Sequence, residues 1–75
     1  MKKPNKFIIK VLDDFRKQGI MEEKDMLNKI GISYETWRRI KANNNISVRT
    51  LKMISDATNV PMLEYYELLE EISED

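Results

Sequence analysis

The sequence predicts an all-α fold, a compact domain of five helices without strands. Apolar residues recur every three or four positions along most of the chain, which is the spacing of one helix face. Residues that commonly end helices separate these stretches, and no stretch alternates polar and apolar residues as a strand would. The 75 residues are expected to form a single domain, residues 1–75.

The predicted helices cover residues 5–18, 22–30, 33–42, 47–58 and 61–72, and an acidic end covers residues 73–75. Gly19 and Gly31 follow the first and second helices, where a left-handed backbone conformation favours glycine. Ser33 and Ser47 are expected to cap the third and fourth helices. Asn59 ends the fourth helix, and the fifth starts at Pro61.

One apolar face of each predicted helix is expected to point into the core. The inward residues of the first three helices are Ile8, Val11, Leu12 and Phe15, then Met26, Leu27 and Ile30, then Trp37 and Ile40. Those of the last two helices are Val48, Leu51 and Ile54, then Met62, Tyr65, Tyr66, Leu69 and Ile72.

Charge is divided unevenly along the chain, although the formal net charge is zero. Residues 1–52 contain all 13 Lys and Arg with six of the 13 Asp and Glu, giving +7, and residues 53–75 contain the other seven acids. This division favours a basic working surface and an acidic end, although charged helix surfaces are common in any protein.

Several function classes are not expected from the residue types present. The chain has no cysteine and no histidine, so we predict no disulfide, no metal site, no catalytic residue and no cofactor. It also lacks a glycine-rich phosphate loop, and an enzyme is not expected. The apolar run near the N-terminus is short and interrupted by Lys10, so a cytoplasmic protein without a membrane segment is predicted.

Residues 26–40 have the layout of a helix-turn-helix, in which a second helix enters the major groove of DNA. With Trp37 and Ile40 inward, the third helix presents Glu35, Arg38 and Arg39 outward, with Tyr34 near its start. Arginine can bind guanine O6 and N7 together, and glutamate can accept from cytosine N4. We therefore expect base contacts from this face, while an ordinary solvated helix surface stays an alternative.

A polar rim is expected around the end of the third helix. Its residues have side chains that commonly bind phosphate oxygens. They are Asn43, Asn44, Asn45, Arg49 and Thr50.

These residues together give the chain a resemblance to a known family. The string Gly31-Ile32-Ser33, then Trp37 and Ile40, the turn at Asn43, Ser47 to Leu51, and the ending Ala57-Thr58-Asn59-Val60 resemble the helix-turn-helix domain of the Cro/C1 phage repressors. The resemblance covers most of the chain and implies a five-helix, lambda-repressor-like domain.

The resemblance also implies contacts. Base contacts would come from Ser33, Tyr34, Glu35 and Arg39, with Arg38 nearby. Phosphate contacts would come from Thr36, Asn44, Arg49 and the surroundings of Glu23. A homodimer on a palindromic site would form through Met62, Tyr65, Tyr66 and Leu69.

The chain departs from the family pattern at three positions. Leu27 replaces the small residue that lets the two helices cross closely. Glu23 stands where many members have a phosphate-binding glutamine, and a carboxylate repels phosphate. Lys41 stands where a glutamate often pairs with a first-helix arginine, here Arg16, and two like charges cannot form that pair.

The predicted function is a sequence-specific transcriptional regulator that binds double-stranded DNA, a repressor of the phage or mobile-element type. Two alternatives stay open. The chain can be a protein-interaction module that kept the fold and lost DNA binding, such as an antirepressor or antitoxin-like protein. It can also be the N-terminal domain of a longer regulator, with the acidic last helix binding a regulatory protein.

Overall fold

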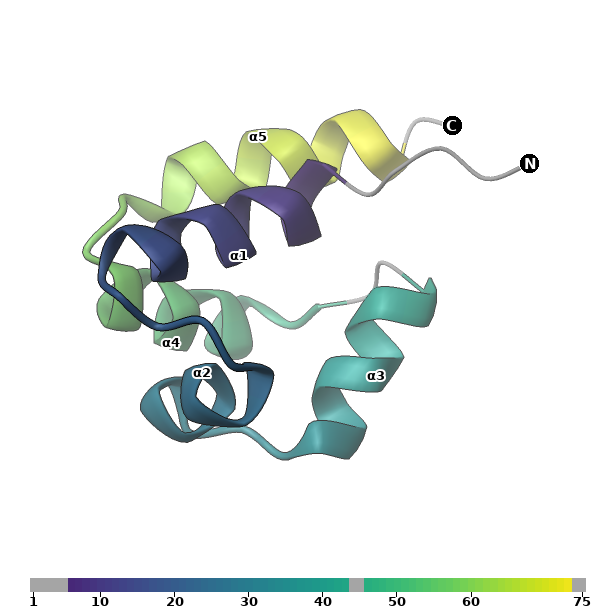
Figure 1. Cartoon of the computed structure of the whole chain (residues 1–75). Coiled ribbons are helices and arrows are strands. Elements are labelled where there is room, and N and C mark those ends of the chain that lie inside the picture. The colour runs from purple at the N-terminus through teal and green to yellow at the C-terminus, as the bar shows by residue number, and fades with distance from the viewer. Residues whose placement is uncertain (1–5, 44–45, 74–75) are drawn as a thin grey trace.

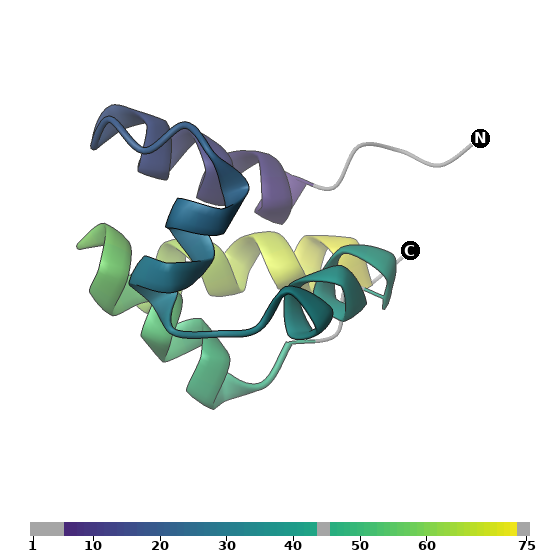
Figure 2. The same cartoon turned by 60° about the horizontal axis from the view of Figure 1, so that its bottom comes forward.

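A computed structural model of the chain describes residues 6–43 and 46–73, with the side chains of residues 6–42 and 46–69. The described residues form five α-helices and no strand, as predicted: α1 (Lys6–Lys17), α2 (Glu23–Ile30), α3 (Tyr34–Asn43), α4 (Val48–Thr58) and α5 (Met62–Ser73). In Figure 1, α1 and α5 run side by side above α4 and α2, and α3 stands at one side. The turned view in Figure 2 also places α3 at the edge of the molecule.

The helix ends follow from local chemistry. Gly19 has φ +84°, and the amides of Gly19 and Ile20 donate to the carbonyls of Arg16 and Phe15, the bonding pattern of a glycine-terminated helix. The Ser47 hydroxyl oxygen accepts the Thr50 amide at 3.1 Å and caps α4, as predicted.

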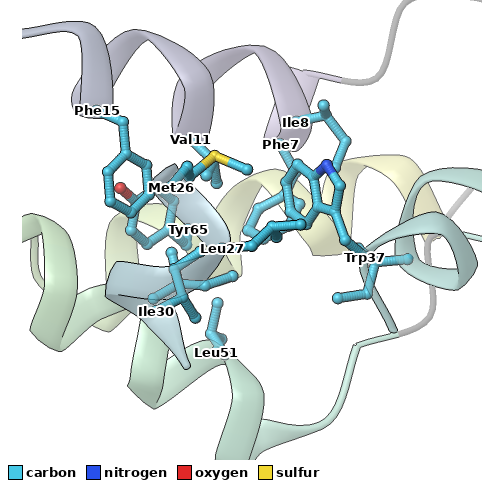
Figure 3. Close-up of a cluster of buried hydrophobic side chains, with 12 residues drawn as sticks. Phe7, Ile8, Val11, Phe15, Met26, Leu27, Ile30, Trp37, Leu51 and Tyr65 are labelled. Carbon is cyan, nitrogen blue, oxygen red and sulfur yellow. The ribbon is translucent and has the colours of Figure 1, made fainter. Parts of the chain in front are cut away.

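The apolar faces of the five helices meet in one core. Figure 3 shows side chains from α1, α2, α3, α4 and α5 in this cluster. Its buried hydrophobic residues are Phe7, Ile8, Val11, Phe15, Met26, Leu27, Ile30, Trp37, Ile40, Leu51, Ile54 and Tyr65. Most of them are the predicted inward residues. Phe7 is also buried, although the sequence analysis did not place it on the inward face of the first helix.

Val48 was predicted to point inward, and this prediction is wrong because Val48 is 70% exposed. Residues three apart on an α-helix are displaced by about 60° around the axis, so Val48 is turned about 120° from Ile54. Leu51 lies between them and is buried, as is Ile54. Apolar residues spaced only by three, such as Val48, Leu51 and Ile54, therefore drift around the helix, and the first of them no longer lies on the face that contacts the core.

α5 is also rotated relative to the predicted stripe. Tyr66, expected inward, is 48% exposed, whereas Leu68 packs against the core. Tyr65 of α5 is 0% exposed, and its ring forms a T-shaped pair with that of Phe7 on α1 at a centroid distance of 5.7 Å. The predicted role of Tyr65 in a dimer interface is therefore wrong, because its side chain is enclosed by its own chain.

Candidate nucleic-acid interface

The turn between α2 and α3 is built on Gly31. Its φ of +93° lies in the left-handed region that other residues avoid. The Gly31 amide donates to the Leu27 carbonyl at 2.8 Å, and the Ile32 amide donates to the same carbonyl at 3.3 Å. This geometry ends α2 and lets the chain begin α3 three residues later.

Ser33 caps α3. Its hydroxyl oxygen accepts the Thr36 amide at 3.1 Å, and it lies 3.0 Å from the Thr36 hydroxyl oxygen. Ser33 was predicted to contact a base and Thr36 a phosphate. In the free chain both hydroxyls are engaged with each other, and α3 begins at Tyr34.

The inner face of α3 holds the helix to the protein as predicted. Trp37 is 0% exposed and Ile40 is 2% exposed. Figure 3 shows the Trp37 indole reaching toward Phe7 and Ile8 of α1. Its Nε1–H donates to Glu23 Oε2 at 2.8 Å, so the largest inward side chain of α3 has a polar partner on α2.

The outer face of α3 brings the predicted base-contact residues together. Tyr34, Glu35, Arg38 and Arg39 are all exposed. With Lys41 and Ala42 they line one shallow surface depression made entirely by α3. Only Ser33 lies outside it, at the cap.

The arginines on this side of the molecule have free charges, whereas Lys41 of α3 pairs with Glu23. Within the part of the chain that the structure describes, Arg38, Arg39 and Arg49 have no carboxylate at ion-pair distance. The bases of α1 are different, because Lys10, Arg16 and Lys17 each lie within 4 Å of an Asp or Glu oxygen. Unpaired positive charge is therefore present on α3 and on the first turn of α4, and the described part of the chain also has it on Lys24, Lys29 and Lys52.

The predicted phosphate contacts are only partly brought together. Arg49 is exposed in the first turn of α4, but the Thr50 hydroxyl oxygen accepts the Ser47 hydroxyl at 3.0 Å. The Asn43 side chain and residues Asn44 and Asn45 lie outside the described part of the chain.

The predicted dimer residues on α5 have different environments. Met62 and Leu69 are partly buried and pack against the core, and Tyr65 is fully buried. Tyr66 is exposed together with Leu63, which is 64% exposed and which the sequence analysis missed. Leu63 and Tyr66 stand three residues apart, a spacing that places them on one side of the helix. That spacing was visible in the sequence.

Glu23 is the site residue whose role the sequence analysis missed. It accepts from Lys41 Nζ at 3.2 Å in addition to Trp37. The sequence indicated that Lys41 cannot pair with Arg16, and the structure pairs Arg16 with Asp13 and Lys41 with Glu23. No local pattern connects position 23 with positions 37 and 41, so only the folded arrangement shows this cluster.

Other kinds of site find little support in the described residues. Among them, no three Asp or Glu side chains gather in a way that could hold a metal ion. Every helix within residues 6–43 and 46–73 is too short or too polar to span a lipid bilayer.

The chain matched no protein-family model, no curated protein and no solved structure in the comparisons. The function has to be inferred from the residues themselves.

Proposed function

We propose that this chain is a sequence-specific DNA-binding regulator of the Cro/C1 type that inserts α3 into the major groove. The observation that carries the proposal is the division of α3 into two faces. Trp37 and Ile40 are buried, and Glu35, Arg38 and Arg39 are exposed on the opposite side. An α-helix with its side chains is about as wide as the major groove of B-DNA.

The chemistry of the outer face suits base recognition. The guanidinium groups of Arg38 and Arg39 can each bind guanine O6 and N7, and the Glu35 carboxylate can accept from cytosine N4. Neither arginine has to break an ion pair with a described residue before it meets DNA. Arg49 and the free amides in the first turn of α4 are suited to the phosphate backbone.

A homodimer on two half-sites completes the proposal. Two copies of α3 would have to lie about 34 Å apart to enter successive major grooves. Leu63 and Tyr66 on α5 are the exposed large apolar residues available for pairing, with the outer edges of Met62 and Leu69 beside them. A repressor of this kind acts by occupying a site that polymerase or another protein needs, and it would work in the cytoplasm.

Selection of bound duplexes from a random DNA pool tests the proposal most directly. We expect enrichment of a short sequence repeated with two-fold symmetry. Binding to the selected duplex should weaken steeply between about 50 and 200 mM salt, because phosphate contacts release counterions. No enrichment over several rounds, or an affinity that ignores salt, would contradict the proposal.

Arg39→Ala distinguishes a contact with a base from a sequence-independent contact with the phosphate backbone. If Arg39 binds a base, the variant should lose about 1–3 kcal/mol on the selected site and tolerate changes at one base pair. Arg16→Ala is the matched control, since it removes an exposed arginine from the last turn of α1, away from α3 (Figure 1). An equal loss on every duplex would show that Arg39 contacts phosphate.

A protein-interaction module is the second candidate, in which α5 binds another protein. Leu63 and Tyr66 are exposed on the same helix as Glu64 and Glu67, so an apolar surface with acidic neighbours is available. A defined protein that co-purifies through α5, together with no retention on any duplex, would favour this candidate over DNA binding.

A further inference from the structure

Glu23 connects α2 to α3 through a single oxygen atom. Its Oε2 accepts the Trp37 indole N–H at 2.8 Å and the Lys41 ammonium at 3.2 Å. Trp37 and Lys41 are four residues apart and so lie one above the other on α3. One carboxylate oxygen at the first residue of α2 therefore holds two successive turns of α3.

The burial of the three groups decides what each contact contributes. Trp37 is 0% exposed, and a buried indole N–H that loses its acceptor carries the full cost of its lost hydrogen bond with water. The side chains of Glu23 and Lys41 are 37% and 38% exposed. An ion pair this open is weak by itself. The indole hydrogen bond is therefore the specific contact, and Lys41 compensates the carboxylate charge beside it.

This contact matters because the rest of the α3 attachment has little directional preference. α3 contacts α2, and its apolar side chains Trp37 and Ile40 enter the common core, where the indole reaches toward α1 (Figure 3). Apolar burial is non-directional, so it tolerates small rotations of a helix about its own axis that keep its apolar side chains covered. A hydrogen bond between a fixed indole and a carboxylate on the neighbouring helix does not. Rotation of α3 would turn its outer face away from the direction it now has.

We propose that Glu23 is a positioning residue that fixes the orientation of α3 on α2, and thereby the direction in which Glu35 and Arg39 point. The DNA part of this inference rests on the proposed function. The orientation of α3 is a property of the free chain and can be measured without DNA. The cluster also assigns Glu23 a role other than a phosphate contact, which its charge disfavours.

Three variants separate the contacts. Glu23→Gln keeps an oxygen that accepts the indole proton and removes the charge. Glu23→Ala removes both contacts, and Lys41→Met removes only the ion pair while keeping the apolar stem. Trp37→Phe is a further variant, in case the alanine variant does not fold, which keeps an aromatic ring and removes the N–H donor together with part of the buried indole.

The first measurement is hydrogen exchange of the indole N–H, which belongs to the only tryptophan in the chain. Glu23→Ala should accelerate this exchange by ~10- to 100-fold, as expected for loss of a hydrogen bond to a charged group. Glu23→Gln and Lys41→Met should change it by only a few fold. Unchanged exchange in the alanine variant, or equal acceleration in all three variants, would overturn the inference.

The second measurement is DNA discrimination under conditions where each variant is folded. Glu23→Ala and Trp37→Phe should lose most of the preference for the selected duplex over one with altered half-sites, while weak binding to any duplex stays. Glu23→Gln should keep the preference. A variant that loses the indole contact and still discriminates as well as the unaltered chain would show that Glu23 only stabilises the fold.

Failure of the proposed function gives a different result. If the unaltered chain holds no duplex, the contacts between α2 and α3 in nuclear Overhauser spectra decide the inference. Contacts that change in Glu23→Ala and persist in Glu23→Gln support the orienting role of Glu23. Contacts that persist in both overturn it.

Discussion

At the scale of single residues, Tyr65 is the side chain on which three helices converge. Its hydroxyl donates to Asp14 Oδ2 on α1 at 2.6 Å and lies 3.0 Å from Thr58 Oγ1 on α4. The Lys10 ammonium lies 5.6 Å from the centre of the Tyr65 ring. It also lies within ion-pair distance of Asp14. Among the described residues, every buried side-chain polar atom has a hydrogen-bond partner. The core therefore specifies the position of α5 through polar contacts as well as packing.

Tyr65→Phe tests this polar contact. Asp14 and Thr58 are both about 6% exposed, so loss of the phenol hydroxyl leaves buried oxygens with fewer partners. We expect the free energy of unfolding to fall by about 1–3 kcal/mol, measured by urea denaturation. Tyr66→Phe is the matched control because its hydroxyl belongs to an exposed side chain, and it should change stability by less than about 0.5 kcal/mol. Similar losses in the two variants would contradict the role of Tyr65.

The pH dependence of stability gives a second test at this residue. Burial, and then the hydrogen bond to Asp14, raise the pKa of the Tyr65 phenol above its usual value of 10.0. Between that value and the raised pKa, only the unfolded chain releases the proton, so it binds fewer protons than the folded chain. The stabilisation that comes from the raised pKa of Tyr65 is complete below pH 10 and is lost as the pH rises above that value. Urea denaturation from pH 8 to 11 should show a steeper alkaline loss for the unaltered chain than for Tyr65→Phe, and parallel curves would contradict this.

At the scale of helices, the sequence predicted the order and the caps well because these depend on near neighbours. Ser33, Ser47 and Gly31 have the roles that their residue types favour. Asn59 ends α4 with φ +61°, as expected. Side-chain direction was harder to predict because it depends on which helices meet. Val48 and Tyr66 follow apolar spacings in the sequence, but no neighbouring helix covers them.

The two serine caps allow a prediction about α3. Ser33→Ala should cost about 0.5–2 kcal/mol of stability, because the Thr36 amide loses its acceptor. Ser47→Ala removes the same contact from α4 and should cost a similar amount. Amide hydrogen exchange distinguishes them, since the first variant should expose the first turn of α3 and the second that of α4. The same exchange pattern in both variants would mean that α3 and α4 open together.

At the scale of the whole molecule, the outer face of α3 could be predicted from sequence, but its attachment could not. The wheel position of Glu35, Arg38 and Arg39 follows once Trp37 and Ile40 are assigned inward. Glu23 contacts Trp37, which is 14 positions away in the sequence, and Lys41, which is 18 positions away. Such pairs depend on how two helices cross. The same reasoning explains Tyr65, whose partner Asp14 is 51 positions away. Distances of that kind are fixed by packing and leave no periodic signal.

The exposed face of α5 leads to a prediction about assembly. If two copies pair through Leu63 and Tyr66, Leu63→Glu places a carboxylate in their contact beside Glu64 and Glu67 of the same helix. Burial of an unpaired charge is strongly unfavourable, so the dimer should dissociate in sedimentation experiments. Met21→Glu is the matched control, because Met21 is 72% exposed and precedes α2, outside α5.

DNA binding then reports on the same interface. A dimer gains affinity on a duplex with two half-sites because binding of one copy brings the other to its site. Leu63→Glu should therefore weaken binding to the two-site duplex and leave binding to a single half-site unchanged, whereas Met21→Glu should affect neither. Because α3 and α5 are separate elements, unchanged half-site binding also shows that the fold and the outer face of α3 are intact. Equal loss on both duplexes would place Leu63 in the folding of the chain and remove α5 as the dimer contact.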